Sequence, residues 1–370
     1  MADSWVFFRA GAEYSKGIDP YYADGMPFVH GPLSLPIYKL FASLNIFIAS
    51  LIWELGVVLC GLLLAYLLHN FYGIKPLHFY ILLTLTAPLR TTLGNGQVAM
   101  LVAVAIVLAM NYEDLTESKI KYLVLIFSVL VILTLKPYLI IPVALKLAIN
   151  KRYIPLYASS LGSLFSFTVL GLGLTESYFR ALIGRGNDIE SESTNYSFSS
   201  LLNTVTDWGL VSTLVALFIG VLALATLLKN QKTVGNDWVY FLSPFLVSPF
   251  VHSQDLVLML IPLVSVTTVR GNEENWSWQG ILALSLLSSA FTNFGLYIEI
   301  VTTIFFVFYF KLRKNRFIVV SPIPVSLLAN DSWRSDNLAQ AYFLYGSALA
   351  SAVILVCLAI YKQQKFPILN

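Results

Sequence analysis

Residues 44–68 read LNIFIASLIWELGVVLCGLLLAYLL, a run of apolar side chains with a single charged residue, Glu54. A helix rises about 1.5 Å per residue and the hydrocarbon core of a bilayer is about 30 Å thick, so this run is long enough to cross a membrane. The rest of the chain has the same character, because 57% of its 370 residues are hydrophobic and only 12% are charged. Soluble domains carry about a quarter charged residues. The composition therefore predicts an integral membrane protein.

Further apolar runs extend this prediction to an all-α polytopic bundle of about 10–12 transmembrane helices, some of them short. The runs lie at 76–92, 96–111, 122–149, 153–174, 209–228, 238–250, 256–269, 278–294, 296–310 and 341–361. Lys136-Pro137 interrupts the run at 122–149, which predicts two helices that meet at a break. No segment has the composition of a soluble domain, so residues 1–370 are expected to form one membrane-embedded domain.

The distribution of Lys and Arg predicts the orientation in the membrane, because these residues are enriched in cytoplasmic loops. Basic residues gather at 119–121, 151–152, 229–232 and 311–316. Alternating the spans then places two long segments, 1–43 and 175–208, on the extracytoplasmic side. The first of them is too aromatic for a solvated tail, and residues 34–44 predict an interfacial helix before the first span. We expect a multi-pass protein of the plasma (inner) membrane.

Several classes of function are not indicated by the sequence. The formal net charge is +3 and no basic cluster is long enough for a nucleic-acid patch. The two cysteines, Cys60 and Cys357, lie in apolar runs and make neither a disulfide framework nor a zinc-binding spacing. No metal and no cofactor is expected.

Ionisable groups within apolar runs are costly, so each is a candidate for function. Arg90 precedes a turn that ends in Gln97 and is rich in backbone donors, which suits an anion such as phosphate. Lys136 sits at the break described above. His252 and Asp255 are three residues apart and can share a helix face. The competing interpretations are snorkelling cations for Arg90 and Lys136, and a structural hydrogen-bonded pair for the other two.

Several short motifs follow one another between residue 3 and about residue 265. They are DSWVFFRAG from Asp3, GIDPY to Tyr21, FVHGP around His30, GQVAML with Gln97, LKP with Lys136, NYSFSSLL from Asn195, and SPFVHSQD with His252 and Asp255. Together they resemble glycosyltransferase family 87, the polyprenol-phosphate-mannose-dependent mannosyltransferases of the GT-C class. Val98 and Val29-His30-Gly31 depart from the family pattern. The family has a transmembrane helix before its catalytic aspartate, and we expect this first helix to be absent from the sequence.

The resemblance implies a GT-C-like fold and transfer of a hexose, with mannose expected, from a polyprenyl-phosphate donor to a lipid or glycan acceptor. The reaction is expected at the extracytoplasmic face, with inversion at the anomeric carbon. Asp3 matches the family's catalytic base, and Lys136, His252 and Arg90 are expected to line one pocket for the donor phosphate. The implied substrate-binding residues are Tyr21, His30, Gln97, Asn195 and Asp255.

Three other interpretations stay open. A transporter or flippase for a lipid-linked sugar would share the apolar bulk, but it predicts inverted repeats and a site at the membrane midplane. Another GT-C branch would use a different polyprenyl-linked sugar or a protein acceptor. The third interpretation is a non-catalytic membrane partner in glycan assembly, in which Asp3 would not act as a catalytic base. The gathering of candidate residues on one predicted face favours an interfacial enzyme.

Overall fold

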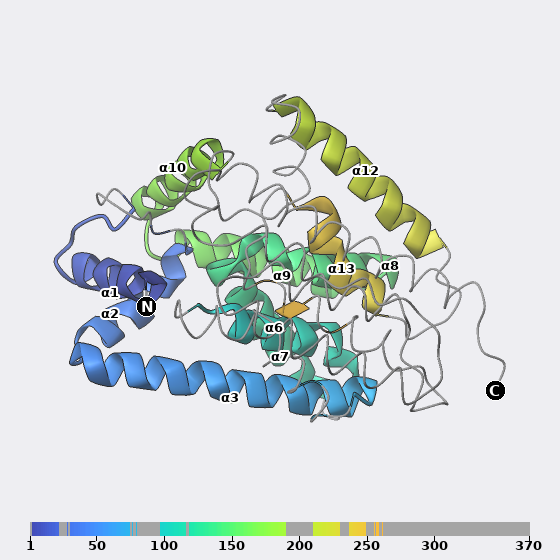
Figure 1. Cartoon of the computed structure of the whole chain (residues 1–370), viewed down its shortest axis with the longest axis horizontal. Coiled ribbons are helices and arrows are strands. Elements are labelled where there is room, and N and C mark those ends of the chain that lie inside the picture. The colour runs from blue at the N-terminus through green and yellow to red at the C-terminus, as the bar shows by residue number, and fades with distance from the viewer. Residues whose placement is uncertain are drawn as a thin grey trace, which may run out of the picture. The chain divides into compact units, whose positions relative to one another are not determined.

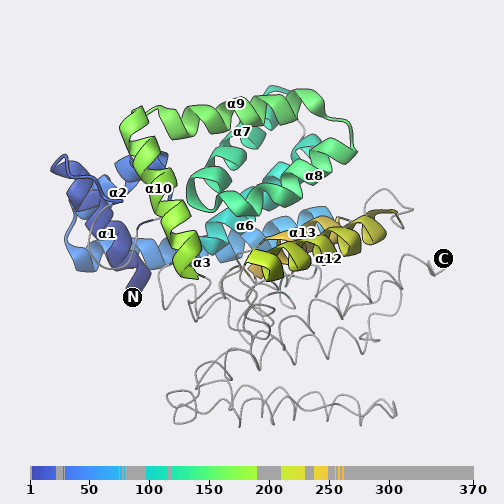
Figure 2. The same ribbon diagram turned by 90° about the horizontal axis from the view of Figure 1, so that it is seen from above.

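The computed structural model describes residues 2–21, 28, 30–74, 76, 79, 97–115, 118–189, 210–229, 237–248, 255, 257–258 and 261. Every regular element in these ranges is a helix (Figures 1 and 2), which confirms the all-α prediction. The chain forms two compact units, Met1–Pro76 with Arg90–Ser191, and Leu77–Leu89 with Glu192–Asn370. A polytopic bundle that acts as one domain stays a prediction.

The apolar run at 44–68 forms the longest described helix, α3 (Ile46–Tyr72), of 27 residues. The Asn45 side chain accepts a hydrogen bond from the Phe47 N–H at 2.9 Å at its start. Gly73, with a left-handed φ of 66°, ends it. Among the described helices, α3 is the one both long and apolar enough to cross a membrane, with a mean hydropathy of 2.3 over its most apolar stretch. The shorter apolar helices span Ala99–Met110, Pro137–Ile149 and Thr213–Lys229.

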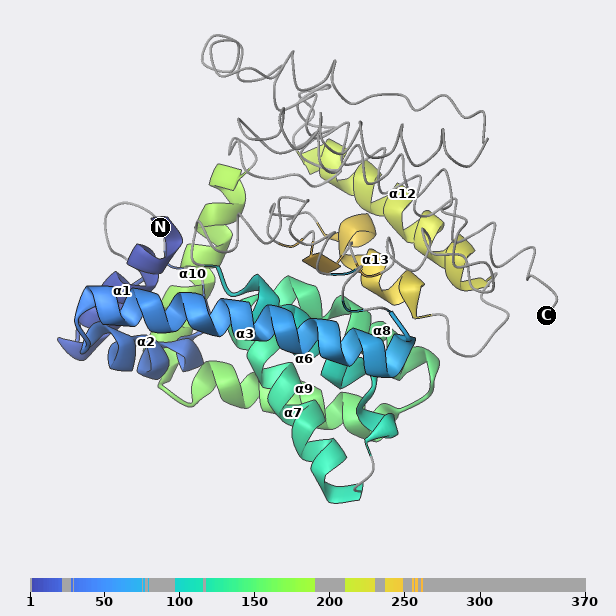
Figure 3. The same ribbon diagram turned by 60° about the horizontal axis from the view of Figure 1, so that its bottom comes forward.

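The core of the first unit is built around α6 (Ala99–Met110), in which ten of the 12 residues are buried. Most of these residues are alanine or valine, and such small side chains allow neighbouring helices to approach closely. One side of α6 packs against α3 and another against α7 (Ser118–Leu135), which in turn packs against α9 (Tyr153–Thr168) (Figure 3). The predicted run at 96–111 is therefore a buried central helix.

The predicted break at Lys136-Pro137 is confirmed. Helix α7 ends at Leu135, a 3₁₀ turn η3 (Pro137–Ile140) follows, and α8 (Ile141–Ile149) begins. Proline has no N–H to continue the helix, and it drives the preceding residue out of the helical region. Lys136 accordingly has φ −146° and ψ 76°. The break holds Lys136 at the end of α7.

The prediction of a loop over 175–208 was wrong in its first part. Helix α9 ends at Thr168, Gly171 adopts a φ of 108°, and α10 (Leu172–Ile189) starts directly afterwards. This turn also divides the apolar run predicted at 153–174. Glu176 and Arg180 form an exposed ion pair one turn apart at 2.5 Å, a local contact that favours the helix. Residues 190–209 lie outside the described residues.

The first 43 residues, predicted as an outer loop, are largely helical. Helix α1 (Ala2–Ser15) was not predicted, whereas the helix expected at 34–44 is confirmed as a 3₁₀ turn η1 (Pro32–Ser34) that leads into α2 (Leu35–Ala42). Helices α1 and α2 pack side by side near the start of α3 (Figure 1). Gly11 permits this contact, because a Cβ atom there would lie 2.2 Å from the Tyr38 carbonyl oxygen.

Replacing Gly11 by alanine is expected to destabilise the first unit, because the methyl group would force α1 away from the α2 backbone. Overpacking of this kind costs about 1–3 kcal/mol. The apparent melting temperature of the purified protein in detergent should fall by several degrees. Gly56→Ala is the matched control, since nothing lies within 4 Å of a Cβ atom at that position of α3. Equal melting temperatures for the two variants would contradict the packing argument.

The described helices of the second unit agree with the sequence. The runs at 209–228 and 238–250 form α12 (Leu210–Lys229) and α13 (Trp238–Val247), which pack against each other. Gly220 lies against the backbone of Leu246 at this contact. The runs predicted at 76–92 and 256–269 fall mostly outside the described residues, and those at 278–294, 296–310 and 341–361 fall entirely outside them.

Candidate functional site

Five aromatic side chains of the N-terminal segment form one buried group, which we call the His30 cluster. Its members are Phe7, Tyr21, Phe28, His30 and Tyr38, each between 1% and 6% exposed. The Phe7 ring stacks on Tyr38 with the centroids 5.0 Å apart, and its centroid is 4.6 Å from that of His30. Burial of these rings explains why an aromatic segment outside the apolar runs folds instead of forming a solvated tail.

His30 makes two polar contacts within this cluster. Its Nδ1 shares a hydrogen bond of 2.6 Å with the Tyr38 hydroxyl, and its carbonyl accepts one of 2.9 Å from the Tyr21 hydroxyl. Burial raises the pKa of Tyr38, and burial together with the neighbouring Tyr178 and Asp19 raises that of Tyr21. Both phenols are therefore protonated at neutral pH, and the Tyr21 hydroxyl is the donor to His30.

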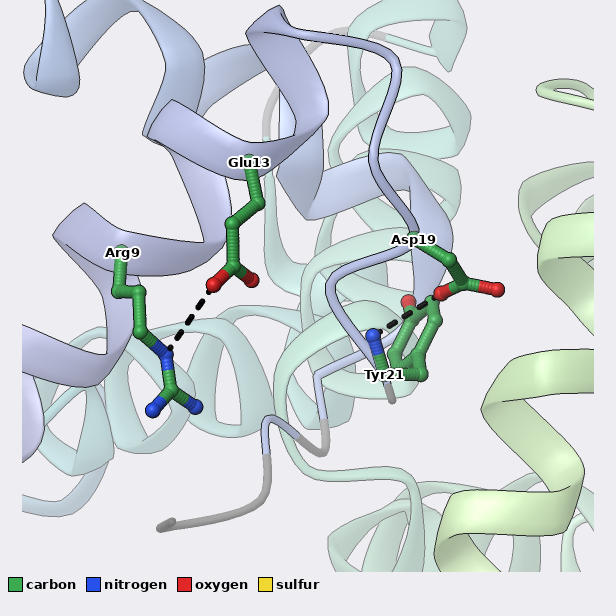
Figure 4. Close-up of polar contacts among 4 residues, drawn as sticks. All are labelled: Arg9, Glu13, Asp19 and Tyr21. Carbon is green, nitrogen blue, oxygen red and sulfur yellow. Dashed lines mark hydrogen bonds and ion pairs between the residues drawn. The ribbon is translucent and has the colours of Figure 1, made fainter. Parts of the chain in front are cut away.

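Two further polar contacts lie on α1 and on the segment that follows it (Figure 4). The Asp19 carboxylate accepts a hydrogen bond of 2.9 Å from the Tyr21 N–H, which closes a tight turn. On α1, Arg9 Nε lies 3.7 Å from the Glu13 carboxylate one turn later. Asp19 thus has a structural contact that an asparagine would also make.

The N-terminal segment reaches the end of α7 through Gly31. Its N–H donates to the Thr134 carbonyl at 2.6 Å, and a Cβ atom at Gly31 would lie 3.2 Å from that oxygen and 3.3 Å from the Phe167 ring. Lys136 follows two residues later and is buried, with 4% exposure. Its Nζ donates to the Tyr138 hydroxyl at 3.3 Å. A cation held at this break in the helix makes the turn a candidate anion site.

Helices α9 and α10 supply an aromatic wall to the same place. Phe167 of α9 stacks on Tyr178 of α10 with the centroids 5.5 Å apart, and Tyr178 meets Tyr21 edge-on at 5.8 Å. Figure 2 shows α10 turning away from the end of α9. Burial raises the pKa of Tyr178 to about 12, so its hydroxyl keeps its proton at neutral pH.

The opposite end of the first unit, near the start of α7, carries charged and polar side chains in place of the aromatic cluster. The Arg152 guanidinium pairs with the Glu113 carboxylate at 2.7 Å, and the Asn111 side-chain amide donates to the hydroxyl of Tyr72, the last residue of α3, at 2.7 Å. Lys119 lies exposed in the first turn of α7 at this end. The aromatic cluster and the basic residues are therefore separated by the length of α7, which is about 27 Å for 18 residues.

The structure brings the predicted site residues Tyr21 and His30 together by a hydrogen bond, and the Gly31–Thr134 hydrogen bond places their segment two residues before Lys136. Asp3 lies in the first turn of α1, one turn before Phe7. Gln97 is buried directly before α6. Asp255 is buried within the second unit, whereas Arg90, Asn195 and His252 lie outside the described residues. The predicted pocket of Lys136, His252 and Arg90 is thus untested.

Three residues of this region were not predicted from the sequence: Tyr38, Thr134 and Tyr178. Tyr38 lies on the helix expected at 34–44, and its position close in sequence to other aromatic residues could have indicated that it belongs to the same buried group. Thr134 and Tyr178 carry no motif, because only the packing of α7, α9 and η1 brings them near Gly31. Within the described residues, no group of three or more His, Cys, Asp or Glu side chains gathers to hold a metal ion.

Comparison with known proteins gives no match for this chain among family models, curated sequences or solved structures.

Proposed function

We propose that this protein is an integral membrane glycosyltransferase. It transfers a hexose, with mannose expected, from a polyprenyl-phosphate donor to a lipid or glycan acceptor at the extracytoplasmic face. The observation that carries the proposal is the 2.6 Å hydrogen bond from the Gly31 N–H to the Thr134 carbonyl. It joins two stretches that are far apart in the sequence and resemble separate motifs of glycosyltransferase family 87, the aromatic segment and the turn with Lys136.

The chemistry of such a transfer needs a base and a cation. The acceptor hydroxyl oxygen forms a bond to the anomeric carbon of the sugar, while the bond from that carbon to the phosphate oxygen breaks. The Asp3 carboxylate takes the proton of the hydroxyl. The departing polyprenyl phosphate gains negative charge, which the Lys136 ammonium group stabilises. A single displacement inverts the anomeric centre, so a β-linked donor yields an α-glycoside.

Exposed apolar side chains support a membrane location for the first unit. Leu123 and Phe127 of α7 are 66% and 67% exposed, and α9 exposes Tyr157, Leu161 and Leu164 to between 64% and 67%. Most of the outward residues of α3 are apolar as well. Exposed apolar side chains in this number are rare on soluble monomers and are favourable against lipid. These helices therefore extend the case for a multi-pass protein beyond α3.

The two ends of the first unit support the proposed orientation. Lys119, Lys151 and Arg152 lie at one end of α7, and the His30 cluster and Lys136 lie at the other. The excess of basic residues marks a cytoplasmic side. The candidate site then faces the extracytoplasmic leaflet, where a polyprenyl-linked sugar and a polar acceptor can both reach it.

Cysteine labelling tests this orientation. In a background without Cys60 and Cys357, a membrane-impermeant maleimide applied to intact cells is expected to label Ser15→Cys and to spare Lys119→Cys. Both positions are exposed, so access depends on the side of the membrane. Permeabilised cells are the control and should label both. Labelling of both positions from the same side in intact cells would overturn the orientation.

A further inference from the structure

Among the described residues, two buried hydroxyl groups near the candidate site have no hydrogen-bond partner, those of Tyr178 and Thr134. Tyr178 is fully buried, and Thr134 is 6% exposed. A buried polar group without a partner costs about 1–3 kcal/mol. The fold gains nothing from these two hydroxyls in the absence of a ligand, since phenylalanine and valine would fill the same volumes.

Other hydroxyl groups in the described helices do find partners. Ser160, Thr168 and Thr226 each donate to the carbonyl four residues earlier, at 2.8–2.9 Å. A threonine hydroxyl within a helix can commonly donate to the carbonyl four residues earlier, yet the Thr134 hydroxyl does not make this bond. Tyr21, in ring contact with Tyr178, is bonded to the His30 carbonyl. The hydroxyls of Tyr178 and Thr134 therefore differ from comparable hydroxyl groups elsewhere in the described residues.

A continuous set of contacts links the two hydroxyl-bearing residues. The Thr134 carbonyl accepts from Gly31, Gly31 lies against the Phe167 ring, and Phe167 stacks on Tyr178. Lys136 follows Thr134 by two residues. One small region thus offers a cation, two hydroxyl donors and aromatic surfaces. A phosphorylated sugar combines an anion with hydroxyl groups and C–H faces that match these features.

We infer that Tyr178 and Thr134 form a sugar subsite, in which their hydroxyls bind the hexose hydroxyls of a polyprenyl-phosphate-linked sugar whose phosphate binds near Lys136. This inference rests on the proposed function and adds the two residues that select the sugar. The Tyr178 phenol is protonated at neutral pH, so it can donate to a sugar oxygen. Because Tyr178 is fully buried without a ligand, α10 must shift locally to admit the sugar.

The test compares Tyr178→Phe and Thr134→Val with Tyr21→Phe as the matched control. The probes are a short-chain polyprenyl-phosphate-mannose and the same polyprenyl phosphate without sugar, with binding to the purified full chain measured by titration. Tyr178→Phe and Thr134→Val should each weaken binding of the sugar-bearing lipid about 5- to 30-fold and leave binding of the sugar-free lipid unchanged. Without ligand, their melting temperatures should equal or exceed the wild-type value. Tyr21→Phe should lower it, because the bond to His30 is lost.

Two results would overturn the sugar subsite. One is equal weakening of both lipids, or a ligand-free melting temperature that falls as for Tyr21→Phe, because either would indicate a structural role. The other is a wild-type protein that binds both lipids equally. If wild-type protein still transfers mannose in either case, the proposed function stands and only the subsite is wrong. If it neither transfers mannose nor binds either lipid, both proposals fail.

Discussion

Replacing Asp3 by asparagine is expected to reduce sugar transfer by about 100- to 10,000-fold, the contribution of a general base. The amide keeps the size of the side chain but cannot take the proton from the acceptor hydroxyl. Folding and donor binding should be unchanged, because neither depends on the proton transfer. The measurement is transfer from polyprenyl-phosphate-mannose to a lipid or glycan acceptor by the full chain in proteoliposomes, with donor binding measured in parallel.

Asp19→Asn is the matched control for this experiment. The Asp19 carboxylate accepts a hydrogen bond from the Tyr21 N–H at 2.9 Å, and an asparagine side-chain carbonyl can accept the same bond. Transfer by Asp19→Asn should therefore stay close to the wild-type rate. If Asp3→Asn keeps that rate while Asp19→Asn loses it, the base is Asp19. If both variants are fully active, neither of these carboxylates is the base.

Replacing Lys136 by methionine is expected to lower the transfer rate by about 100- to 1,000-fold, a loss typical of removing one group that stabilises developing negative charge. Methionine is similar in length and is apolar, so it suits the buried position while removing the cation. Binding of sugar-free polyprenyl phosphate should weaken as well. Lys136→Arg keeps the charge and should recover part of both losses.

Lys39→Met serves as the control for Lys136, because Lys39 is an exposed lysine on α2 outside the proposed phosphate site. Its transfer rate should stay within about twofold of the wild-type rate, as for most surface substitutions. Equal losses in the two variants would indicate a general effect of charge on lipid binding. If the wild-type chain transfers no sugar from any polyprenyl donor, the enzyme proposal gives way to a flippase or a non-catalytic partner.

Local signals in the sequence were enough to predict several features of the structure. The apolar run at 44–68 predicted α3 because an uninterrupted stretch of that length has few alternatives to a long helix. Pro137 predicted the break after α7 because proline cannot continue a helix. The aromatic residues around His30 predicted an ordered segment, since such side chains gain free energy by burial.

Contacts between distant segments were decided by the tertiary structure alone. Nothing near Gly31 in the sequence indicates that its N–H binds the Thr134 carbonyl, because that contact depends on how η1 packs against α7 and α9. The charged residues after position 175 predict a loop, yet Glu176 and Arg180 pair on a new helix, α10, which begins directly after the turn at Gly171.

The residues of the candidate site also divide into those that the sequence indicates and those that only the tertiary structure reveals. The sequence alone singled out Lys136, because a charge within an apolar run is visible one residue at a time, and Asp3 was singled out by the motif that resembles the family. The tertiary structure decided which neutral residues surround Lys136. Tyr178 and Thr134 are ordinary residues in the sequence. Only helix packing buries their two hydroxyls and leaves these hydroxyls without a hydrogen-bond partner among the described residues. Burial and missing partners are properties of a packed structure, and the order of residues does not encode them locally.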